Sequence, residues 1–308
     1  MRVLGHIHTM NDAAVIEQAL EGLRRQTRPP DALLIVDNAS TDATLDRIFP
    51  ETATIIRNAE NLGTSGAIRI GFDHALKHGF DWTWVFDADT VPEPEALERL
   101  LDFFDRLPRA EQERVCFLTG WPLNAAGEAK QPAIRLGEAG LEFIPLETPR
   151  DSTRCDCILW SGSLFRMAAV AQIGLPSADY VLDIAEIEYG YRARRLGFMS
   201  YIVHDNAICH DVGREPGAPP RLYRLGPIRI TFRETPPIRT YYSVRNMLYF
   251  WLYQHKPRQI IWPFRWVAWR AAVLTLSFVA QPRRSKAQVL ACFRGIWHGV
   301  TGNMAARY

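Results

Sequence analysis

The segment WTWVFDADT, residues 82–90, is the most informative part of the sequence for the fold. Trp82 to Phe86 are all aromatic or β-branched, which favours a buried strand, and two acids follow at Asp87 and Asp89. Two carboxylates at a strand end cannot be buried unpaired, because burying an uncompensated charge is costly. A divalent cation on a diphosphate would satisfy both, since Mg²⁺ and Mn²⁺ take hard oxygen ligands. The alternative is a solvated turn, which explains many Asp-x-Asp triplets. The apolar strand that precedes Asp87 makes a metal site the more specific interpretation.

Strands and helices are predicted to alternate over the first 120 residues. Asp12 is expected to cap the first helix, whose apolar residues follow i, i+4, i+7 spacing. Strands are expected at 3–8, 33–36, 54–56 and 82–86, with helices after 12, over 65–77 and after 92–95. Such repeats predict an α/β protein with a mostly parallel, doubly wound sheet and helices on both faces. Ligands of these sheets bind beyond the carboxyl ends of the strands.

Two further turns fall at such strand ends. In DNASTD, residues 37–42, Asp37 could accept a hydrogen bond from a pyrimidine NH or a ribose hydroxyl, or it could form a turn that only caps the next helix. NAENLGTSG, residues 58–66, places small residues before a helix N-terminus, where phosphate can approach. The segment lacks G-x-G-x-x-G, so a nicotinamide-dinucleotide site is not supported.

Acidic residues gather again in DIAEIEYGYR, residues 183–192. Glu188 and Arg192 are four residues apart on a predicted helix and should pair. That leaves Asp183 and Glu186 for a substrate, because a carboxylate without a fixed cation can take a proton. An ordinary acidic helix start is the alternative. His210, after the strand-like segment 202–209, could complete a metal shell begun by Asp89, although a lone histidine is more often structural.

The composition is that of an ordinary globular chain. Of its 308 residues, 47% are hydrophobic and 23% are charged, which excludes a disordered, collagen-like or disulfide-stapled protein. The five cysteines lack zinc-like spacing, and no early run resembles a signal peptide. We therefore expect free thiols in a reducing, cytoplasmic location.

Basic residues are concentrated in the last quarter of the chain. Residues 235–308 contain 11 Lys and Arg and no acid, so residues 1–234 hold the other 25 basic residues and all 34 acids. The same tail carries five of the nine tryptophans: Trp251, Trp262, Trp266, Trp269 and Trp297. A basic, Trp-rich tail suggests an anionic partner, either a membrane or a nucleic acid. The alternative is a tail that packs on its own domain.

The tail is not expected to cross a bilayer. Its longest uncharged run, residues 271–282, has 12 residues, whereas a span needs about 20. Arg265 and Arg270, interleaved with Trp262, Trp266 and Trp269, suit an amphipathic helix lying among lipid headgroups. We therefore expect a catalytic domain over residues 1–234 and a helical, membrane-surface region over residues 235–308. The loop 213–220 could act as a flap over a ligand.

Together these motifs resemble the family 2 glycosyltransferases of the GT-A type over roughly residues 1–255. The matching stretches are VDNASTDAT (36–44), NLGTSGA (61–67), FDADT (86–90), SGSLFR (161–166), DIAEIEYGYRARRLG (183–197) and ICHDVG (208–213). RTYYSVRN (239–246) is the kind of segment found in the rhamnosyltransferase-like and galactofuranosyltransferase-like branch. The resemblance implies a GT-A fold.

The resemblance also implies an inverting, metal-dependent transfer of a sugar, with rhamnose or galactofuranose favoured. The donor would be a TDP- or UDP-sugar, the cofactor Mn²⁺ or Mg²⁺, and the acceptor a glycan or lipid-linked hydroxyl. The protein would then bind peripherally to the cytoplasmic face of a membrane and would have no nucleic-acid partner. It could form a homo-oligomer. The alternatives are an inactive nucleotide-sugar-binding module and a nucleic-acid-binding protein that uses the basic tail.

Site residues follow from the resemblance by position. It implies donor contacts from Thr9, Asn11, Asp37, Asn38, Asn61, Gly63, Arg69 and Asp87, acceptor contacts from Ser161 and Gly162, and metal contacts from Asp87, Asp89 and His210. Glu186 stands where the family usually has an aspartate as catalytic base, and Asp183 is the alternative base. Arg69 stands where an asparagine is common, which leaves the identity of the donor open.

Overall fold

The computed structural model describes residues 1–48, 53–124, 127, 133–137, 140–144, 151–210, 221–225, 228–232, 236–255, 268 and 282–308. The loop 213–220, and the tryptophans and arginines of the amphipathic segment expected at 262–270, lie outside these residues. The chain divides into two compact units. The first comprises residues 1–136, 141–178 and 186–214, and the second comprises residues 137–140, 179–185 and 215–308.

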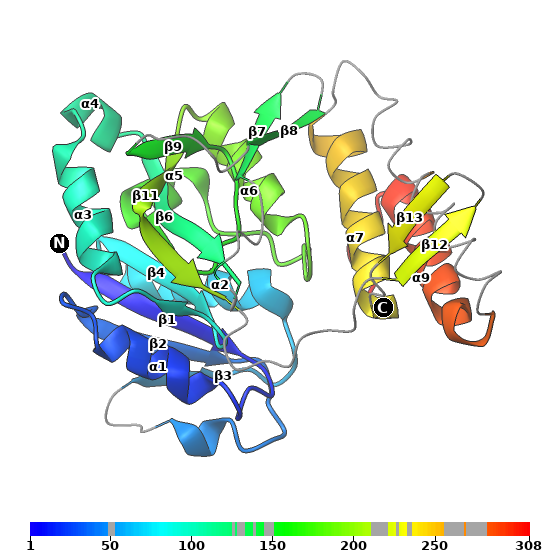
Figure 1. The fold of residues 1–308 in the computed structure, drawn as a ribbon, viewed down its shortest axis with the longest axis horizontal. Helices are drawn as coiled ribbons and strands as arrows, with labels where there is room; N and C mark the ends of the chain where they lie inside the picture. The colour runs from blue at the N-terminus through cyan, green and yellow to red at the C-terminus, as the bar shows by residue number, and fades with distance from the viewer. Residues whose placement is uncertain are drawn as a thin grey trace. The chain divides into compact units, whose positions relative to one another are not determined.

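A nine-stranded sheet organises the first unit (Figure 1). Its order is β3 (Thr54–Arg57), β2 (Ala32–Asp37), β1 (Val3–Thr9), β4 (Trp82–Asp87), β10 (Ser163–Arg166), β6 (Val115–Leu123), β11 (Met199–Cys209) and β5 (Val91–Pro92), with β9 (Ser152–Cys155) also paired to β11. Strands β3, β2, β1, β4, β6 and β11 run in one direction, while β10, β5 and β9 run against them. The sheet is therefore mixed but mostly parallel, as the sequence predicts.

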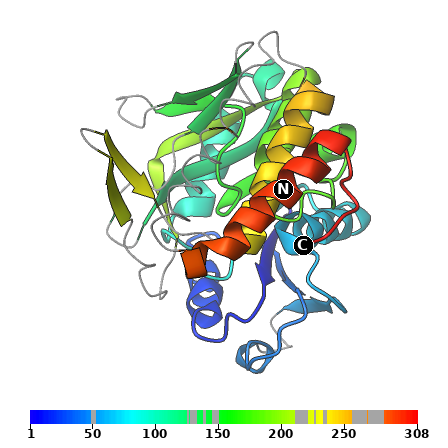
Figure 2. The ribbon, with the colours of Figure 1, turned by 90° about the vertical axis from the view of Figure 1, so that its right-hand side faces the viewer.

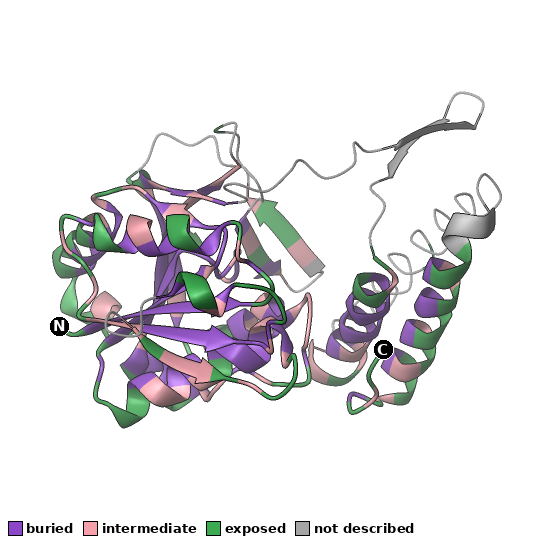
Figure 3. Ribbon diagram, turned by 90° about the horizontal axis from the view of Figure 1, so that it is seen from below, coloured by how far each residue is buried: buried purple, intermediate pink, exposed green. Residues whose placement is uncertain are grey.

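Helices cover both faces of this sheet, whose strands are largely buried (Figure 3). On one face, α1 (Ile16–Arg24) and α3 (Ala96–Arg106) pack their apolar stripes on residues such as Val3 and Ile7. The other face carries α2 (Gly63–Lys77), α5 (Met167–Ile173) and α6 (Ala185–Arg195). Strand alternation therefore turns His6 toward α2, where Gly71 leaves room for its ring, because a Cβ on Gly71 would lie 2.7 Å from Nδ1 of His6. Two short helices, η1 (Leu45–Arg47) and α4 (Arg109–Gln112), lie in the connections.

The expected alternation of strands and helices is confirmed, but the cap of the first helix is wrong. α1 begins at Ile16, and the Asp12 carboxylate instead accepts hydrogen bonds from the Thr9 hydroxyl and the Met10 N–H, both at 2.9 Å. The backbone carbonyl of Asp12 accepts the Ile16 N–H at the start of the helix, at 3.0 Å. An aspartate side chain is short, so the preceding turn takes it first. All five cysteines are free.

The second unit is built on two helices. α7 (Pro237–Tyr249), which continues as a π-helical turn (Phe250–His255), lies beside α9 (Pro282–Thr301) in both Figure 1 and Figure 2. Glycines let the two backbones approach, because a Cβ on Gly295 would lie 2.7 Å from the carbonyl oxygen of Tyr241.

Two hairpins complete the described chain: β7 (Ala133–Gly137) with β8 (Gly140–Ile144), and β12 (Arg221–Leu225) with β13 (Ile228–Phe232). No helix among the described residues is long and apolar enough to cross a bilayer.

Candidate active site

Parallel pairing brings the acidic strand ends together at one edge of the sheet. Strand β1 lies between β2 and β4, so that His8 is opposite Asp87 and Thr9 is opposite Asp37. The turns at Asp37 and Asp87, which the sequence indicated separately, therefore lie on either side of the turn after β1. The edge carries polar side chains from three distant parts of the chain.

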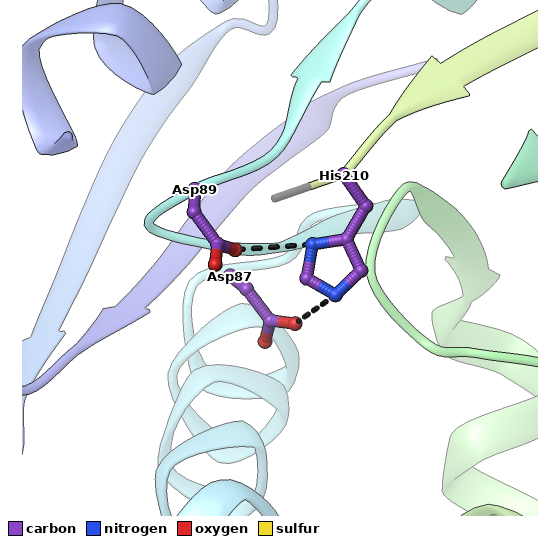
Figure 4. Close-up of side chains that lie close together, drawn as sticks. All are labelled: Asp87, Asp89 and His210. Carbon is purple, nitrogen blue, oxygen red and sulfur yellow. Dashed lines mark ion pairs between the residues drawn. The ribbon is translucent and has the colours of Figure 1, made fainter. Parts of the chain in front are cut away.

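Asp87, Asp89 and His210 form a compact group in which each offers one ligand atom, and these atoms lie within 4.8 Å of one another (Figure 4). His210 Nε2 lies 3.3 Å from Asp87 Oδ2, and His210 Nδ1 lies 3.1 Å from Asp89 Oδ1. His210 follows the end of β11, where its N–H donates to the Leu123 carbonyl at 2.8 Å. Asp89 and His210 are buried and Asp87 is partly exposed, so the group opens to solvent through Asp87.

A chain of hydroxyl groups holds this turn in shape. The Asp87 N–H donates to Ser161 Oγ at 2.8 Å, and the Ser161 hydroxyl donates to Thr90 Oγ1 at 2.7 Å. Thr90 Oγ1 lies 3.0 Å from Nδ1 of His210. Ser161 therefore supports the acidic turn from the loop before β10. Its expected contact with an acceptor stays a prediction.

His8 belongs to this group, and sequence reasoning assigned it no role. Its Nε2 lies 2.7 Å from Asp87 Oδ1, on the side of the carboxylate away from His210. Burial opposes a charge on His8, but the adjacent Asp87 carboxylate outweighs it and raises the pKa of His8. Burial likewise opposes the charge on Asp87, yet His8 and His210 together lower the pKa of Asp87. The signal was the pair of histidines, His6 and His8, in a buried central strand.

The turns after β1 and β2 are joined to the start of α2 by side-chain amides. Asn38 Nδ2 donates to the Gly63 carbonyl at 3.3 Å, while its Oδ1 accepts from Asn58 Nδ2 at 2.8 Å. Asn11 Oδ1 accepts the Thr41 N–H at 2.8 Å and so ties the first turn to the second. The structure thus gathers these donor-binding candidates into one hydrogen-bonded patch.

Asp37 is fully buried at the end of β2. It accepts the Ser40 N–H at 3.2 Å and lies 3.5 Å from Nε of Arg57. The hydrogen bond to a residue three positions later is the turn that the sequence offered as the alternative, so a contact between Asp37 and a nucleotide stays a prediction. Close by, Asn61 Oδ1 accepts the Gly63 N–H at 2.8 Å, and Gly63 takes a left-handed φ of 72°.

The remaining candidates have other surroundings. Arg69 is exposed on α2 and donates to the Pro176 carbonyl at 3.1 Å. Glu186 is the second residue of α6, and the pair expected between Glu188 and Arg192 is confirmed at 2.7 Å. Asp183 precedes α6 and belongs to the second unit. Arg239 and Ser243 of the same unit donate hydrogen bonds to its two carboxylate oxygens.

The donor set of Asp87, Asp89 and His210 fits a divalent cation. Two carboxylates supply the hard oxygens that Mg²⁺ and Mn²⁺ prefer, and an imidazole nitrogen is acceptable to Mn²⁺. His8 and His210 lie beside these carboxylates, and a bound cation would compensate their charge further. The shell beyond these ligands is already ordered by Thr90 and Ser161, as is usual for metal ligands.

Comparison with known sequences finds a family model and several curated relatives that match parts of this chain. Residues 6–122 match the family model described as glycosyl transferase family 2. The galactofuranosyltransferase GlfT1 of Mycobacterium tuberculosis is 29% identical over 216 residues, which are 66% of this chain and 68% of the relative. The dTDP-rhamnosyl transferase RfbF of Shigella flexneri is 22% identical over 275 residues, which are 88% of this chain and 87% of the relative.

Solved structures show the same fold. GalNAc-T7 with UDP, GalNAc and Mn²⁺ superposes with a TM-score of 0.58 at 14% identity and covers 83% of this chain, which spans about half (49%) of that one. The mannosyltransferase PcManGT from Pyrobaculum calidifontis, in complex with GDP-Man and Mn²⁺, superposes with a TM-score of 0.56 at 13% identity, covering 98% of this chain and 88% of its own.

Proposed function

The chain is a glycosyltransferase with a family 2 domain on a GT-A fold, and we propose that it transfers a sugar from a nucleotide-diphosphate donor to a hydroxyl group with inversion at the anomeric carbon. The observation that carries this proposal is the group of Asp87, Asp89 and His210 at the carboxyl edge of the sheet. Both solved structures named above contain Mn²⁺ together with a nucleotide or a nucleotide sugar.

In the proposed reaction, Asp87, Asp89 and His210 would hold Mn²⁺ or Mg²⁺. The bound cation would neutralise the charge that develops on the departing diphosphate, a Lewis-acid contribution worth several kcal/mol. His8 and Ser161 keep the Asp87 turn in its orientation before the donor arrives. Preorganisation of this kind matters because groups that are already aimed need not reorganise during the reaction.

Donor recognition is assigned to the turns after β1 and β2 and to the start of α2. Thr9, Asn11, Asp37 and Asn38 would face the base and ribose, and the α2 start at Asn61 and Gly63 would face the phosphates. Support comes from the hydrogen bonds that already fix these turns to one another and from the general tendency of helix starts to bind phosphate. A TDP- or UDP-sugar is proposed because one relative is named as a dTDP-rhamnosyl transferase and because GalNAc-T7 was solved with UDP.

Glu186 is proposed as the catalytic base, which takes the proton of the acceptor hydroxyl as that oxygen attacks the anomeric carbon opposite the diphosphate. A general base of this type contributes about 10²–10⁴-fold in rate. Asp183 is the weaker candidate because Arg239 and Ser243 occupy both of its oxygens. Acceptor contacts of Ser161 and Gly162 remain part of the proposal.

The acceptor is proposed to be a glycan or a lipid-linked glycan at an anionic membrane surface. One face of α9 packs on α7, while Leu290, Phe293, Trp297 and Val300 are exposed along the helix, with Trp297 at 68%. In Figure 3 the green residues of α9 lie on the side away from α7. An apolar stripe within a region of 11 basic residues and no acid suits a helix lying among anionic headgroups.

The decisive experiment is a panel of nucleotide sugars measured by thermal unfolding and by turnover, with Mn²⁺ or with chelator. We expect a UDP- or TDP-sugar to raise the midpoint only when Mn²⁺ is present, since a ligand at 100 times its Kd adds about 2.7 kcal/mol of stability. The matching donor should then give product with the inverted anomer by NMR.

Asp89→Asn is expected to abolish both the Mn²⁺-dependent shift and the transfer. Asp102→Asn, a matched change on the exposed face of α3, should keep both. The proposal is wrong if no nucleotide sugar stabilises the folded protein with Mn²⁺, or if Asp89→Asn transfers sugar at the unmodified rate.

A further inference from the structure

The RTYYSVRN segment, residues 239–246, forms most of α7, and the proposed reaction assigns it no role. Three of its polar residues, Arg239, Ser243 and Asn246, recur at i, i+4 and i+7, so they share one face of the helix. All three contact the short segment 179–184, which lies in the same compact unit and leads directly into α6.

Asp183 is the centre of these contacts. Arg239 donates from Nη2 to Asp183 Oδ1 at 3.0 Å and from Nε to the same oxygen at 3.1 Å, and the Ser243 hydroxyl donates to Oδ2. Asn246 Nδ2 donates to the carbonyl of Leu182 at 2.7 Å and to that of Asp183 at 3.1 Å. The helix thus holds both the side chain and the backbone of this turn.

The beginning of the segment is held as firmly. Arg245 is fully buried and donates to the Asp179 carbonyl at 2.5 Å, and the Tyr180 hydroxyl donates to Gln254 at 2.8 Å. Between these points, Val181 and Leu182 pack against a cluster that includes Tyr241 and Tyr242 of α7. The α7 side of the second unit therefore contacts residues at both ends and in the middle of segment 179–184.

The backbone at the end of the segment is strained. Asp183 and Ile184 have φ values of 56° and 67°, the left-handed region that favours glycine. A β-branched residue is rarely found there, and such conformations persist only where the surroundings over-determine them. α6 begins at the next residue, Ala185, and Glu186 follows. The direction in which the chain enters α6 is thus set at a turn that α7 holds in an unfavourable conformation.

We propose that Arg239, Ser243 and Asn246 are positioning residues that fix the start of α6 and, through it, the Glu186 carboxylate. This inference rests on the proposed function, in which Glu186 is the base. It gives the RTYYSVRN segment a role, which is to hold the catalytic base in position for the attack on the donor. Misplacing a catalytic group by about 1 Å can cost roughly 10²-fold in rate.

The test uses the full chain with Arg239→Gln, because Arg239 is more than half exposed and its loss leaves no cavity. Arg307→Gln is the matched control, since Arg307 lies in the same unit but donates to the Met304 carbonyl and not to segment 179–184. In hydrogen exchange, we expect the amides of residues 182–187 to exchange faster in Arg239→Gln only. Mn²⁺-dependent UDP binding should be unchanged in both variants.

Kinetics then separate positioning from general destabilisation. We expect Arg239→Gln to lower kcat by about 10- to 100-fold with the donor KM within about threefold, and Arg239→Lys to recover part of the loss. In a double-mutant cycle, adding Arg239→Gln to Glu186→Gln should cause almost no further loss, because the residue that Arg239 positions is already gone.

Two results would overturn the inference: unchanged exchange at residues 182–187, or an additive loss when Arg239→Gln and Glu186→Gln are combined. If the unmodified protein transfers no sugar from any donor in the panel, the proposed function fails and the link to Glu186 fails with it. The exchange measurement would still show separately whether α7 orders the turn.

Discussion

The charge state of Asp87 depends on the two histidines beside it. Asp87 lies between His8 at 2.7 Å and His210 at 3.3 Å, so one carboxylate is shared by a histidine from the first strand and another from the far end of the domain. The pair of His8 and Asp87 is buried enough for the interaction to be strong, as the raised pKa of His8 and the lowered pKa of Asp87 indicate. Its contribution to folding must therefore depend on pH.

In chelator, the stabilising charge on His8 is complete below its ordinary pKa of 6.5 and is lost as the pH rises through the raised value. The contribution of Asp87 is present above its ordinary pKa of 3.8 and is lost as the pH falls through the lowered value. We expect the difference in unfolding free energy between the unmodified protein and His8→Gln to be largest between about pH 4 and 6.5.

Urea unfolding from pH 3 to 9 measures this difference. The difference should shrink toward both ends of the range. His78→Gln is the control, because His78 is exposed just after the end of α2 and stacks on His74, and it should cause no loss of stability between about pH 4 and 6.5. A difference for His8→Gln that does not vary with pH would contradict the ion pair.

Glu186→Gln tests the second residue-scale assignment. The amide keeps the shape of the side chain but cannot take a proton, so we expect turnover to fall by roughly 10²-fold or more while Mn²⁺-dependent donor binding remains. Asp183→Asn should lower turnover less and should weaken the contact with Arg239. Steady-state kinetics and UDP titration would show the order, and a larger kinetic loss in Asp183→Asn would move the base to Asp183.

At the scale of elements, the loop before β10 connects the metal group to β11. Gly162 has φ 84°, and a Cβ there would lie 2.5 Å from Cγ2 of Ile208, two residues before His210. Its N–H donates to the Val85 carbonyl at 2.7 Å, and its own carbonyl accepts from Nε1 of Trp84 at 3.0 Å. Gly162 therefore lets the loop, β4 and the end of β11 come together at the site.

Gly162→Ala is expected to cost about 1–3 kcal/mol of stability from the clash and the strained φ, and to weaken Mn²⁺ binding because the end of β11 must shift. Gly197→Ala is the control, since Gly197 has φ 81° with no atom within 4 Å of the added Cβ. It should show the strain alone, with Mn²⁺ affinity unchanged. Urea unfolding and Mn²⁺ titration would separate the two, and equal Mn²⁺ affinity in both variants would rule out the coupling.

Across the whole chain, charge divides along the sequence. All 34 acidic residues precede residue 235, whereas 11 basic residues and the exposed stripe on α9 follow it. Each basic residue close to an anionic leaflet contributes about 1 kcal/mol, and buried aromatic side chains add to this. A membrane-bound acceptor and a basic C-terminal region would thus be brought to the same surface.

We expect the protein to sediment with vesicles containing phosphatidylglycerol at low salt and to be released by high salt. Phe293→Ser combined with Trp297→Ser should weaken this binding by about tenfold or more, because both exposed aromatic side chains are lost. Phe143→Ser removes an equally exposed aromatic residue, at 61%, from another element and should have little effect. Equal binding to neutral vesicles in high salt would contradict the electrostatic attachment.

Much of the architecture could be predicted because it depends on local pattern. The run 82–86 has the composition of a buried strand, the spacing of Ile16, Leu20 and Leu23 is that of a helix, and the structure contains both. The proximity of the turns at Asp37 and Asp87 followed from parallel strands ending at one edge. The role of Asp12 could not be predicted, since its carboxylate could accept either from the helix start or from the turn before it, and it accepts from the Thr9 hydroxyl and the Met10 N–H of that turn.

Four features could be predicted from the chain alone, because each depends on residues close together in it: the order of strands and helices, the acids at the strand ends, the pair of Glu188 and Arg192, and the basic tail. Two pairings emerge only from the folded chain: His8 lies opposite Asp87, and Arg239 binds Asp183, 56 residues away. Strand register and helix packing are set by burial across the whole core. Contacts that depend on strand register or helix packing therefore cannot be predicted from the neighbouring residues in the chain.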